Sequence, residues 1–180
     1  DVKAAGYGIS ANISALQLQA PDFVAKVTQR IQHAGIDARK LVLEVTETLL
    51  LTDVDAMIQK MVALQALGVQ FAIDDFGTGY SSLAYLMRLP IQEIKMDQSF
   101  IRDLKPDGPS GAMVQALLMV AKSQNLRVVA EGVEHAEQAQ LLQAWEPSLL
   151  CQGYFFSKPL PVEQWLQNPH QRFDAAATLP

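Results

Sequence analysis

The chain of 180 residues has a single cysteine, Cys151, so it can form neither an internal disulfide nor a cluster of thiolate metal ligands. Its three histidines, His33, His135 and His170, are scattered and do not indicate a histidine-based site. There is no excess of basic residues: the formal net charge is −5, which argues against binding to polymeric nucleic acid. A small anionic ligand held through metal ions remains compatible with this charge.

Long hydrophobic runs are absent as well. The apolar segments are too short to span a membrane, and no signal peptide is visible. With 49% hydrophobic and 18% charged residues, the composition is that of one ordinary globular domain. We therefore expect a cytoplasmic domain, either free or as the cytosolic part of a membrane-anchored protein. The chain begins without Met and close to a predicted strand, so we expect it to be a piece of a longer protein.

Apolar segments of strand length alternate with segments of helical periodicity. The predicted strands cover residues 7–13, 41–45, 69–73, 91–96, 126–130 and 148–153. The predicted helices cover residues 21–34, 53–67, 83–88, 97–104, 112–124, 134–145 and 162–166. Such alternation predicts an α/β fold in which helices cover a parallel sheet.

The glycine-rich phosphate loops G-x-G-x-x-G and G-x-x-x-x-G-K-[ST] follow none of these strands. We therefore favour a TIM-like (β/α)8 barrel over a Rossmann sheet. A full barrel has eight strand–helix units in about 250 residues, so we expect roughly the first two units to lie upstream of residue 1. Residues 1–168 would form this partial domain, and residues 169–180 a weakly patterned C-terminal tail.

Two adjacent carboxylates, Asp74 and Asp75, stand where the third predicted strand runs out into a loop that contains Gly77 and Gly79. Two carboxylates this close repel each other, so one should take up a proton unless a cation keeps both ionised. Hard oxygen ligands of this kind suit Mg²⁺ or Mn²⁺. The alternative is a helix cap and turn with solvated side chains, which would be the better interpretation of an isolated Asp-Asp pair.

Polar residues also mark the ends of the other predicted strands. They are Asn12, Glu44 and Glu47, Lys95 and Asp97, Glu131, and Gln152. Each has a simple explanation by itself: Glu44 could pair with a lysine, Lys95 could reach the surface, Asn12 could cap a turn, and Gln152 could bond the backbone. Because the carboxyl ends of parallel barrel strands converge on one face, the whole series instead predicts a two-cation site of the kind that hydrolyses phosphate esters.

The chain resembles the EAL domain, a bacterial phosphodiesterase family that linearises cyclic di-GMP, from about Tyr7 to Leu160. The matching segments are Ile9-Ser10-Ala11-Asn12-Ile13-Ser14, Leu43-Glu44-Val45-Thr46-Glu47, Asp74-Asp75-Phe76-Gly77-Thr78-Gly79-Tyr80-Ser81-Ser82, Ile94-Lys95-Met96-Asp97, Val129-Ala130-Glu131-Gly132-Val133-Glu134, and Gln152-Gly153-Tyr154-Phe155-Phe156-Ser157-Lys158-Pro159. Each segment alone is moderately specific, and their order is very specific.

The resemblance implies a role for each matching position. It implies a modified barrel with an antiparallel first strand, hydrolysis of cyclic di-GMP to linear pGpG, and two Mg²⁺ or Mn²⁺ ions. The implied metal ligands are Asn12, Glu44, Asp74, Asp75 and Glu131. Lys95 would orient or deprotonate the attacking water, with Glu131 and Glu47 as further catalytic residues, Glu47 by anchoring the Asp74–Tyr80 loop. Gln152 and Asp97 would contact substrate. The loop residues Phe76, Gly77, Thr78, Gly79, Tyr80 and Ser81 would act as a switch, and the Asp74–Ser82 region would form a homodimer.

Two departures from the family pattern affect these expectations. The tripeptide that names the family is absent, and with it a glutamate ligand and a nearby phosphate-binding arginine. The segment from Trp145 to Cys151 is one residue longer than usual, which affects the placement of Gln152. The alternatives are therefore a catalytically inactive receptor for cyclic di-GMP, or an inactive fragment of the enzyme. Sensor or diguanylate-cyclase (GGDEF) domains upstream are common in the family and are expected partners in the parent protein.

Overall fold

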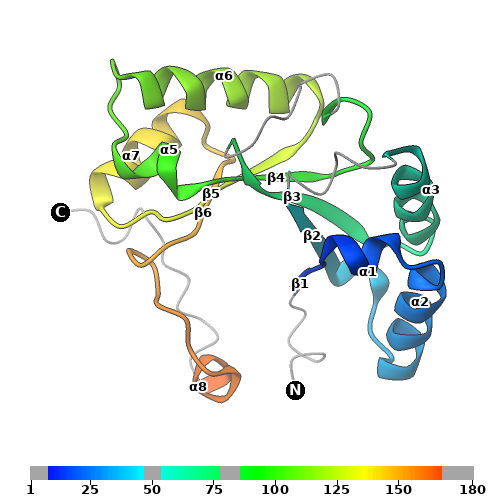
Figure 1. Ribbon diagram of the computed structural model, residues 1–180. Coiled ribbons are helices and arrows are strands. Elements are labelled where there is room, and N and C mark those ends of the chain that lie inside the picture. The colour runs from blue at the N-terminus through cyan, green and yellow to red at the C-terminus, as the bar shows by residue number, and fades with distance from the viewer. Residues whose placement is uncertain (1–7, 47–53, 78–85, 168–180) are drawn as a thin grey trace. The chain divides into compact units, whose positions relative to one another are not determined.

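A computed structural model describes residues 8–46, 54–77 and 86–167. The strands are β1 (Ile9–Asn12), β2 (Leu41–Thr46), β3 (Gln70–Phe76), β4 (Glu93–Met96), β5 (Arg127–Ala130) and β6 (Leu150–Cys151). The helices are α1 (Ala15–Gln19), α2 (Phe23–Ala34), α3 (Val54–Gln65), α5 (Gln98–Arg102), α6 (Pro109–Ser123), α7 (Ala136–Trp145) and α8 (Val162–Gln167), with one 3₁₀ turn, η1 (Ala38–Lys40). Figure 1 shows the course of the chain.

The strands follow one another in chain order in a six-stranded sheet. The pairs β1–β2, β2–β3 and β5–β6 are parallel, as the alternation of strands and helices predicts. The predicted helix at 83–88 falls mostly outside the described residues. Within the described ranges, no helix combines the length and the apolar character needed to cross a bilayer.

The chain packs as two compact units, and the boundary between them lies inside β4. The first unit comprises Asp1–Lys95 and Gln124–Leu126, and the second comprises Met96–Ser123 and Arg127–Pro180. The first unit thus contains β1, β2, β3 and the Glu93–Lys95 part of β4.

In the first unit the two faces of the sheet differ in chemistry. On β2 and β3, the register pairs Leu43 with Phe71 and Val45 with Ile73, and all four side chains are buried. Each large apolar side chain removed from water contributes about 1.5–3 kcal/mol to folding. The alternate residues point to the other face, and among them are Glu44 and Asp74.

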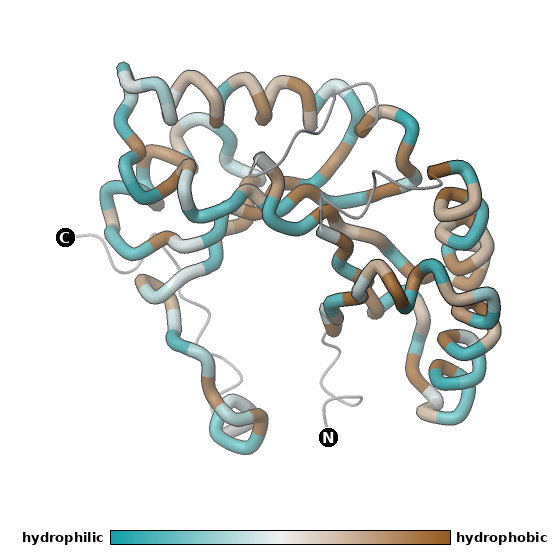
Figure 2. The backbone as a smooth tube through the Cα atoms, in the orientation of Figure 1, coloured by the Kyte–Doolittle hydropathy of each residue, from teal (hydrophilic) through white to brown (hydrophobic). Residues whose placement is uncertain are grey.

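The helices of this unit are amphipathic, and they contact one another. Along α2 and α3, hydrophobic and hydrophilic stretches alternate in Figure 2, and the buried positions follow the helical spacing. They are Phe23, Ile31, Met57, Met61 and Leu64. Helix α2 ends at Gly35, whose φ of 59° is the left-handed conformation typical of a helix C-terminus.

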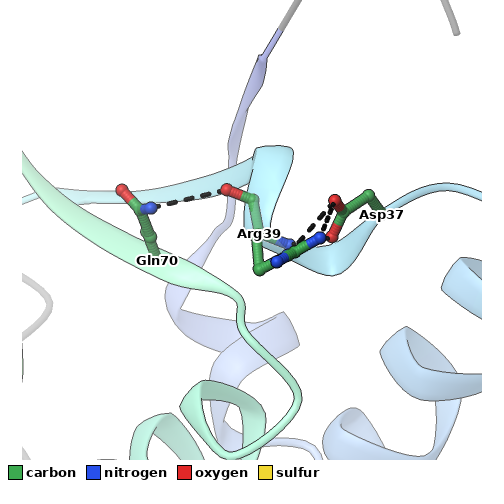
Figure 3. A network of polar contacts seen from close by, with 3 residues as sticks. All are labelled: Asp37, Arg39 and Gln70. Atoms are coloured by element: carbon green, nitrogen blue, oxygen red, sulfur yellow. Dashed lines mark hydrogen bonds and ion pairs between the residues drawn. The ribbon is translucent and has the colours of Figure 1, made fainter. Parts of the chain in front are cut away.

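At the amino ends of β2 and β3, a polar network ties the two strands together (Figure 3). The Arg39 guanidinium donates to both carboxylate oxygens of Asp37, at 2.8 and 3.0 Å, and the Gln70 side chain donates to the Arg39 carbonyl at 3.4 Å. The Arg39 hydrogen bonds lower the pKa of Asp37 below its usual range. Gly68 fits beside this network because a Cβ there would lie 2.8 Å from Arg39 Cγ. The network is at the end of the strands opposite to Asp74.

The second unit is held by a buried amide. The Gln138 side chain on α7 donates to the Ile101 carbonyl at 2.8 Å and accepts from the backbone N–H groups of Glu134 and His135. His135 is the N-cap of α7 and Gln138 is its third residue, so this amide reaches back to the N-cap backbone as in a capping box and ties α7 to α5. Gly153 is required after β6, because a Cβ there would collide with the backbone of Val133.

Candidate active site

Four polar residues lie on one face at the carboxyl ends of β1, β2 and β3. The register pairs Asn12 with Glu44 across β1 and β2, and Thr46 with Asp74 across β2 and β3. Register partners in a parallel pair share a face, and residues two apart on one strand do so too. The sheet therefore brings Asn12, Glu44, Thr46 and Asp74 together, as the sequence predicts for three of the four.

Lys95 on β4 joins this group. Its Nζ donates to Asp74 Oδ1 at 2.8 Å and to Glu44 Oε2 at 3.0 Å. The side chains of Lys95, Glu44 and Asp74 are 9%, 8% and 13% exposed, so three charges are paired out of contact with most of the solvent. Buried charges are stable only when paired and hydrogen-bonded. The simple interpretation that Glu44 pairs with a lysine is thus confirmed, with Lys95 as the partner.

Asp75 departs from the regular strand. The sequence predicts a strand that ends before the two aspartates, whereas β3 continues through both of them to Phe76. Neighbouring strand residues would point to opposite faces, but Asp75 has a φ of 52°, in the left-handed region. Carboxylate oxygens of Asp74 and Asp75 consequently lie within 4.8 Å of each other. Asp75 is exposed and Asp74 is mostly buried, so the pair consists of one open carboxylate and one held by Lys95.

A cavity of about 700 Å³ opens beside these carboxylates. Its lining residues are Asn12, Ile13, Ser14, Ala15, Gln17, Thr46, Asp74 and Asp75. Helix α1 forms part of the wall, and its start is fixed by Ser14 and Gln17, each of which accepts a hydrogen bond from the other's backbone N–H, at 3.3 and 2.9 Å respectively. Sequence reasoning missed α1 and these wall residues, although Ser14-x-x-Gln17 has the pattern of a capping box.

The remaining predicted site residues with described positions belong to the second unit. Glu131 directly follows β5, and its N–H donates to the Met96 carbonyl at 3.1 Å. Gln152 directly follows β6, where its N–H donates to the Ala130 carbonyl at 2.8 Å and its side chain is exposed. Asp97 caps α5: its Oδ1 accepts from the Ser99 N–H at 2.9 Å. The functional roles of these three residues stay predictions.

The predicted switch loop is described only at its start. Phe76 is the half-buried last residue of β3, and Gly77 follows it with a φ of 100°. Glu47, Thr78, Gly79, Tyr80 and Ser81 lie outside the described residues.

The donor chemistry of the first unit fits divalent cations. Asn12, Asp74 and Asp75, whose side chains carry amide and carboxylate oxygens, line the cavity, and Glu44 lies on the same face of the sheet as Asn12. Hard oxygen donors of this type are the ligands that Mg²⁺ and Mn²⁺ prefer. Lys95 pairs with both Glu44 and Asp74, so its single positive charge is shared between two carboxylates.

An α/β fold with parallel strands, carrying clustered carboxylates and a lysine at the carboxyl ends of its strands, defines a candidate hydrolase of the barrel class. The comparison with known families is more specific: the sequence profile of the EAL domain matches residues 2–159. The chain belongs to the EAL domain family, and it has the α/β fold of that family.

Similar proteins are named for their action on cyclic di-GMP. The chain is 41% identical over 164 residues to the bifunctional diguanylate cyclase/cyclic di-GMP phosphodiesterase MucR of Pseudomonas aeruginosa, covering 91% of this chain and 24% of MucR. It is 42% identical over 174 residues to the cyclic di-GMP phosphodiesterase NbdA of the same organism, covering 95% of this chain and 22% of NbdA. The chain thus spans about a quarter of the length of these relatives.

A solved structure of the MucR phosphodiesterase in complex with c-di-GMP superposes with a TM-score of 0.85 at 39% identity, covering 91% of this chain and 72% of that one. A manganese and c-di-GMP complex of Klebsiella pneumoniae BlrP1 matches with a TM-score of 0.77 at 34% identity, covering 84% of this chain and 39% of that one.

Proposed function

We propose that this chain carries the catalytic site of a metal-dependent phosphodiesterase that hydrolyses cyclic di-GMP to linear pGpG. The observation that carries the proposal is the cavity lined by Asn12, Asp74 and Asp75, beside which Lys95 pairs with Glu44 and Asp74. Membership of the EAL family and the names of the relatives support cyclic di-GMP as the substrate.

Five residues would hold two Mg²⁺ or Mn²⁺ ions: Asn12, Glu44, Asp74, Asp75 and Glu131. Asp74 is suited to a position shared by the two ions, because its carboxylate accepts from Lys95 and has an oxygen within 4.8 Å of a carboxylate oxygen of Asp75. Glu131 is included because of the family resemblance and because it directly follows β5, whereas Asn12 is the last residue of β1. When bound, the two cations would supply charge neutralisation at the phosphate and lower the pKa of a water.

Lys95 would position the attacking water at the edge of the cavity. Its Nζ donates to two carboxylates and is held by them in one place, which favours an orienting role over that of a base. The water oxygen attacks phosphorus in line with the leaving 3′ oxygen, the P–O3′ bond breaks, and the 3′ oxygen takes up a proton. The ring then opens to a linear dinucleotide with one terminal phosphate and one free 3′ hydroxyl.

Further roles follow from the family resemblance. Gln152 and Asp97 would contact substrate, Glu47 would anchor the loop after β3, and the Asp74–Ser82 region would form a homodimer interface. The relatives are several times longer than this chain, which supports a parent protein with additional sensor or GGDEF domains. A cytoplasmic location stays a prediction.

The deciding experiment is conversion of cyclic di-GMP followed by chromatography, with Mn²⁺, with Mg²⁺ and with a chelator. We expect pGpG to appear only with a divalent cation. Calorimetric titration of cyclic di-GMP into the same protein separates the alternatives. Binding without pGpG under either metal would replace the enzyme with a receptor, and absence of both binding and turnover would overturn the proposal.

A further inference from the structure

A small residue lies in the middle of the charged face. Ala72 on β3 is the register partner of Glu44 and stands two residues before Asp74, so its methyl group points to the same face as both carboxylates. It is 0% exposed, yet the other buried residues of β3, Phe71 and Ile73, are large. Strand β3 thus places a small buried side chain on the charged face of the sheet and large buried side chains on the apolar face.

The ion pair between Lys95 and Glu44 crosses a whole strand. In the sheet order, β3 lies between β2, which carries Glu44, and β4, which carries Lys95. Neighbouring strands are about 4.8 Å apart, so the backbones of β2 and β4 are separated by roughly 10 Å. The Nζ–Oε2 distance of 3.0 Å is reached only because both side chains extend over β3 toward each other.

The hydrogen bonds of the Lys95 ammonium group place it near residues 72–74 of β3. Nζ is bonded to Asp74 and to Glu44, and Glu44 starts opposite Ala72. The space above Ala72 is thus next to the path by which the two side chains meet. A β-branched or longer side chain at residue 72 would occupy that space, because close-packed interiors have no free volume for added carbons.

We propose that Ala72 is a positioning residue whose small side chain allows Lys95 to bond Glu44 and Asp74 at the same time. Its effect on turnover rests on the proposed function, whereas its effect on the geometry of Lys95 does not. Since Lys95 would orient the attacking water, a larger residue 72 lowers the turnover number more than it changes the binding of substrate.

The test is a series of increasing size, Ala72→Ser, Ala72→Cys and Ala72→Val, with Ala121→Val as the matched control. Ala121 is 1% exposed and lies on helix α6, so it takes the same added atoms in a buried position that belongs to a helix rather than to β3. A role in packing alone predicts similar behaviour for the two valine variants.

The direct readout is the rate of reductive methylation of Lys95 in the folded protein, measured by mass spectrometry against the exposed Lys26 as internal reference. We expect labelling of Lys95 to rise from Ser to Cys to Val at residue 72 and to stay at its original rate in Ala121→Val. With Mn²⁺, kcat should fall by up to about a hundredfold in Ala72→Val, the loss expected when a positioning group is displaced by about 1 Å, with little change in KM.

Two outcomes overturn the inference: labelling of Lys95 that does not increase with the size of residue 72, or an equal increase in Ala121→Val. If Ala72→Val does not fold, Ala72→Cys decides by the same criteria. If the original protein gives no turnover, the proposed function fails while the labelling series still tests Ala72.

Discussion

The ammonium group of Lys60 on α3 donates a hydrogen bond to the carbonyl oxygen of Leu18 on α1, with an Nζ–O distance of 2.8 Å. The same Nζ donates to the carbonyls of Gln19 and Ala20, at 2.8 and 3.1 Å. The last carbonyls of a helix have no partners within it and carry partial negative charge, so a lysine is well matched to them. Because α1 forms part of the cavity wall, Lys60 connects α3 to the candidate site.

We expect Lys60→Met to lower the free energy of unfolding by about 1–3 kcal/mol, since three hydrogen bonds from a charged group to the end of α1 are lost. Urea unfolding measures the change. Lys26→Met is the control, because Lys26 pairs with Asp22 across exposed side chains and such pairs contribute little. Equal changes in the free energy of unfolding for the two substitutions would show that the contacts of Lys60 with α1 do not stabilise the protein.

Substitutions in the buried group of Lys95, Glu44 and Asp74 should lower the free energy of unfolding by unequal amounts. Lys95→Met should destabilise the protein by about 3–5 kcal/mol, because two mostly buried carboxylates lose their counter-charge. Glu44→Gln should cost less, because Lys95 keeps Asp74 as a partner. The double variant should be more stable than the sum of the single changes implies, as expected for residues in contact. Additive free energies in urea unfolding would contradict the contacts between these side chains.

Asp75→Asn should abolish most Mn²⁺-dependent turnover. The amide keeps the size of the side chain but removes its charge, and metal stabilisation of the transition state is worth several kcal/mol, or a loss on the order of a hundredfold. Asp107→Asn, an exposed aspartate in the loop before α6, is the matched control and should behave like the original protein. Chromatography of pGpG provides the measurement. Turnover at the original rate in Asp75→Asn would remove Asp75 from the ligand set.

Burial raises the pKa of the half-buried Cys151 thiol above its usual range. The folded thiol therefore stays neutral at pH 8, and iodoacetamide should alkylate it more slowly than in the urea-unfolded chain at the same pH. A raised pKa also means that the contribution of this group to stability is complete below its unfolded pKa and is lost as the pH rises through the folded pKa. Cys151→Ala should remove that alkaline loss. Equally fast alkylation of folded and unfolded protein would refute the shift.

The strands and most helices could be predicted because their signals are local. The apolar runs of β2 and β3 and the helical spacing of Phe23 and Ile31 in α2 indicate the type of each element without knowledge of the fold. The convergence of Asn12, Glu44 and Asp74 was also predictable, because parallel strands bring their carboxyl ends to one edge.

Other features depend on the three-dimensional context. Helix α1 is too short for an apolar period, and α6 begins at Pro109, three residues before the predicted start, because proline suits the first turn of a helix. The extension of β3 through Asp75 needs a backbone angle that no local pattern specifies. The contact of Lys95 with Glu44 spans a strand, so only the sheet order could reveal it.

The left-handed backbone conformation of Asp75 implies a trade-off between thermal stability and catalytic activity at this one position. A non-glycine residue with a φ of 52° costs about 1–3 kcal/mol, and glycine or asparagine would relieve part of that cost. A library selected only for survival of heating should therefore accumulate Gly or Asn at residue 75, whereas a library selected for hydrolysis should retain Asp. The residue found at this position in a natural variant then indicates which of the two selections has acted on it.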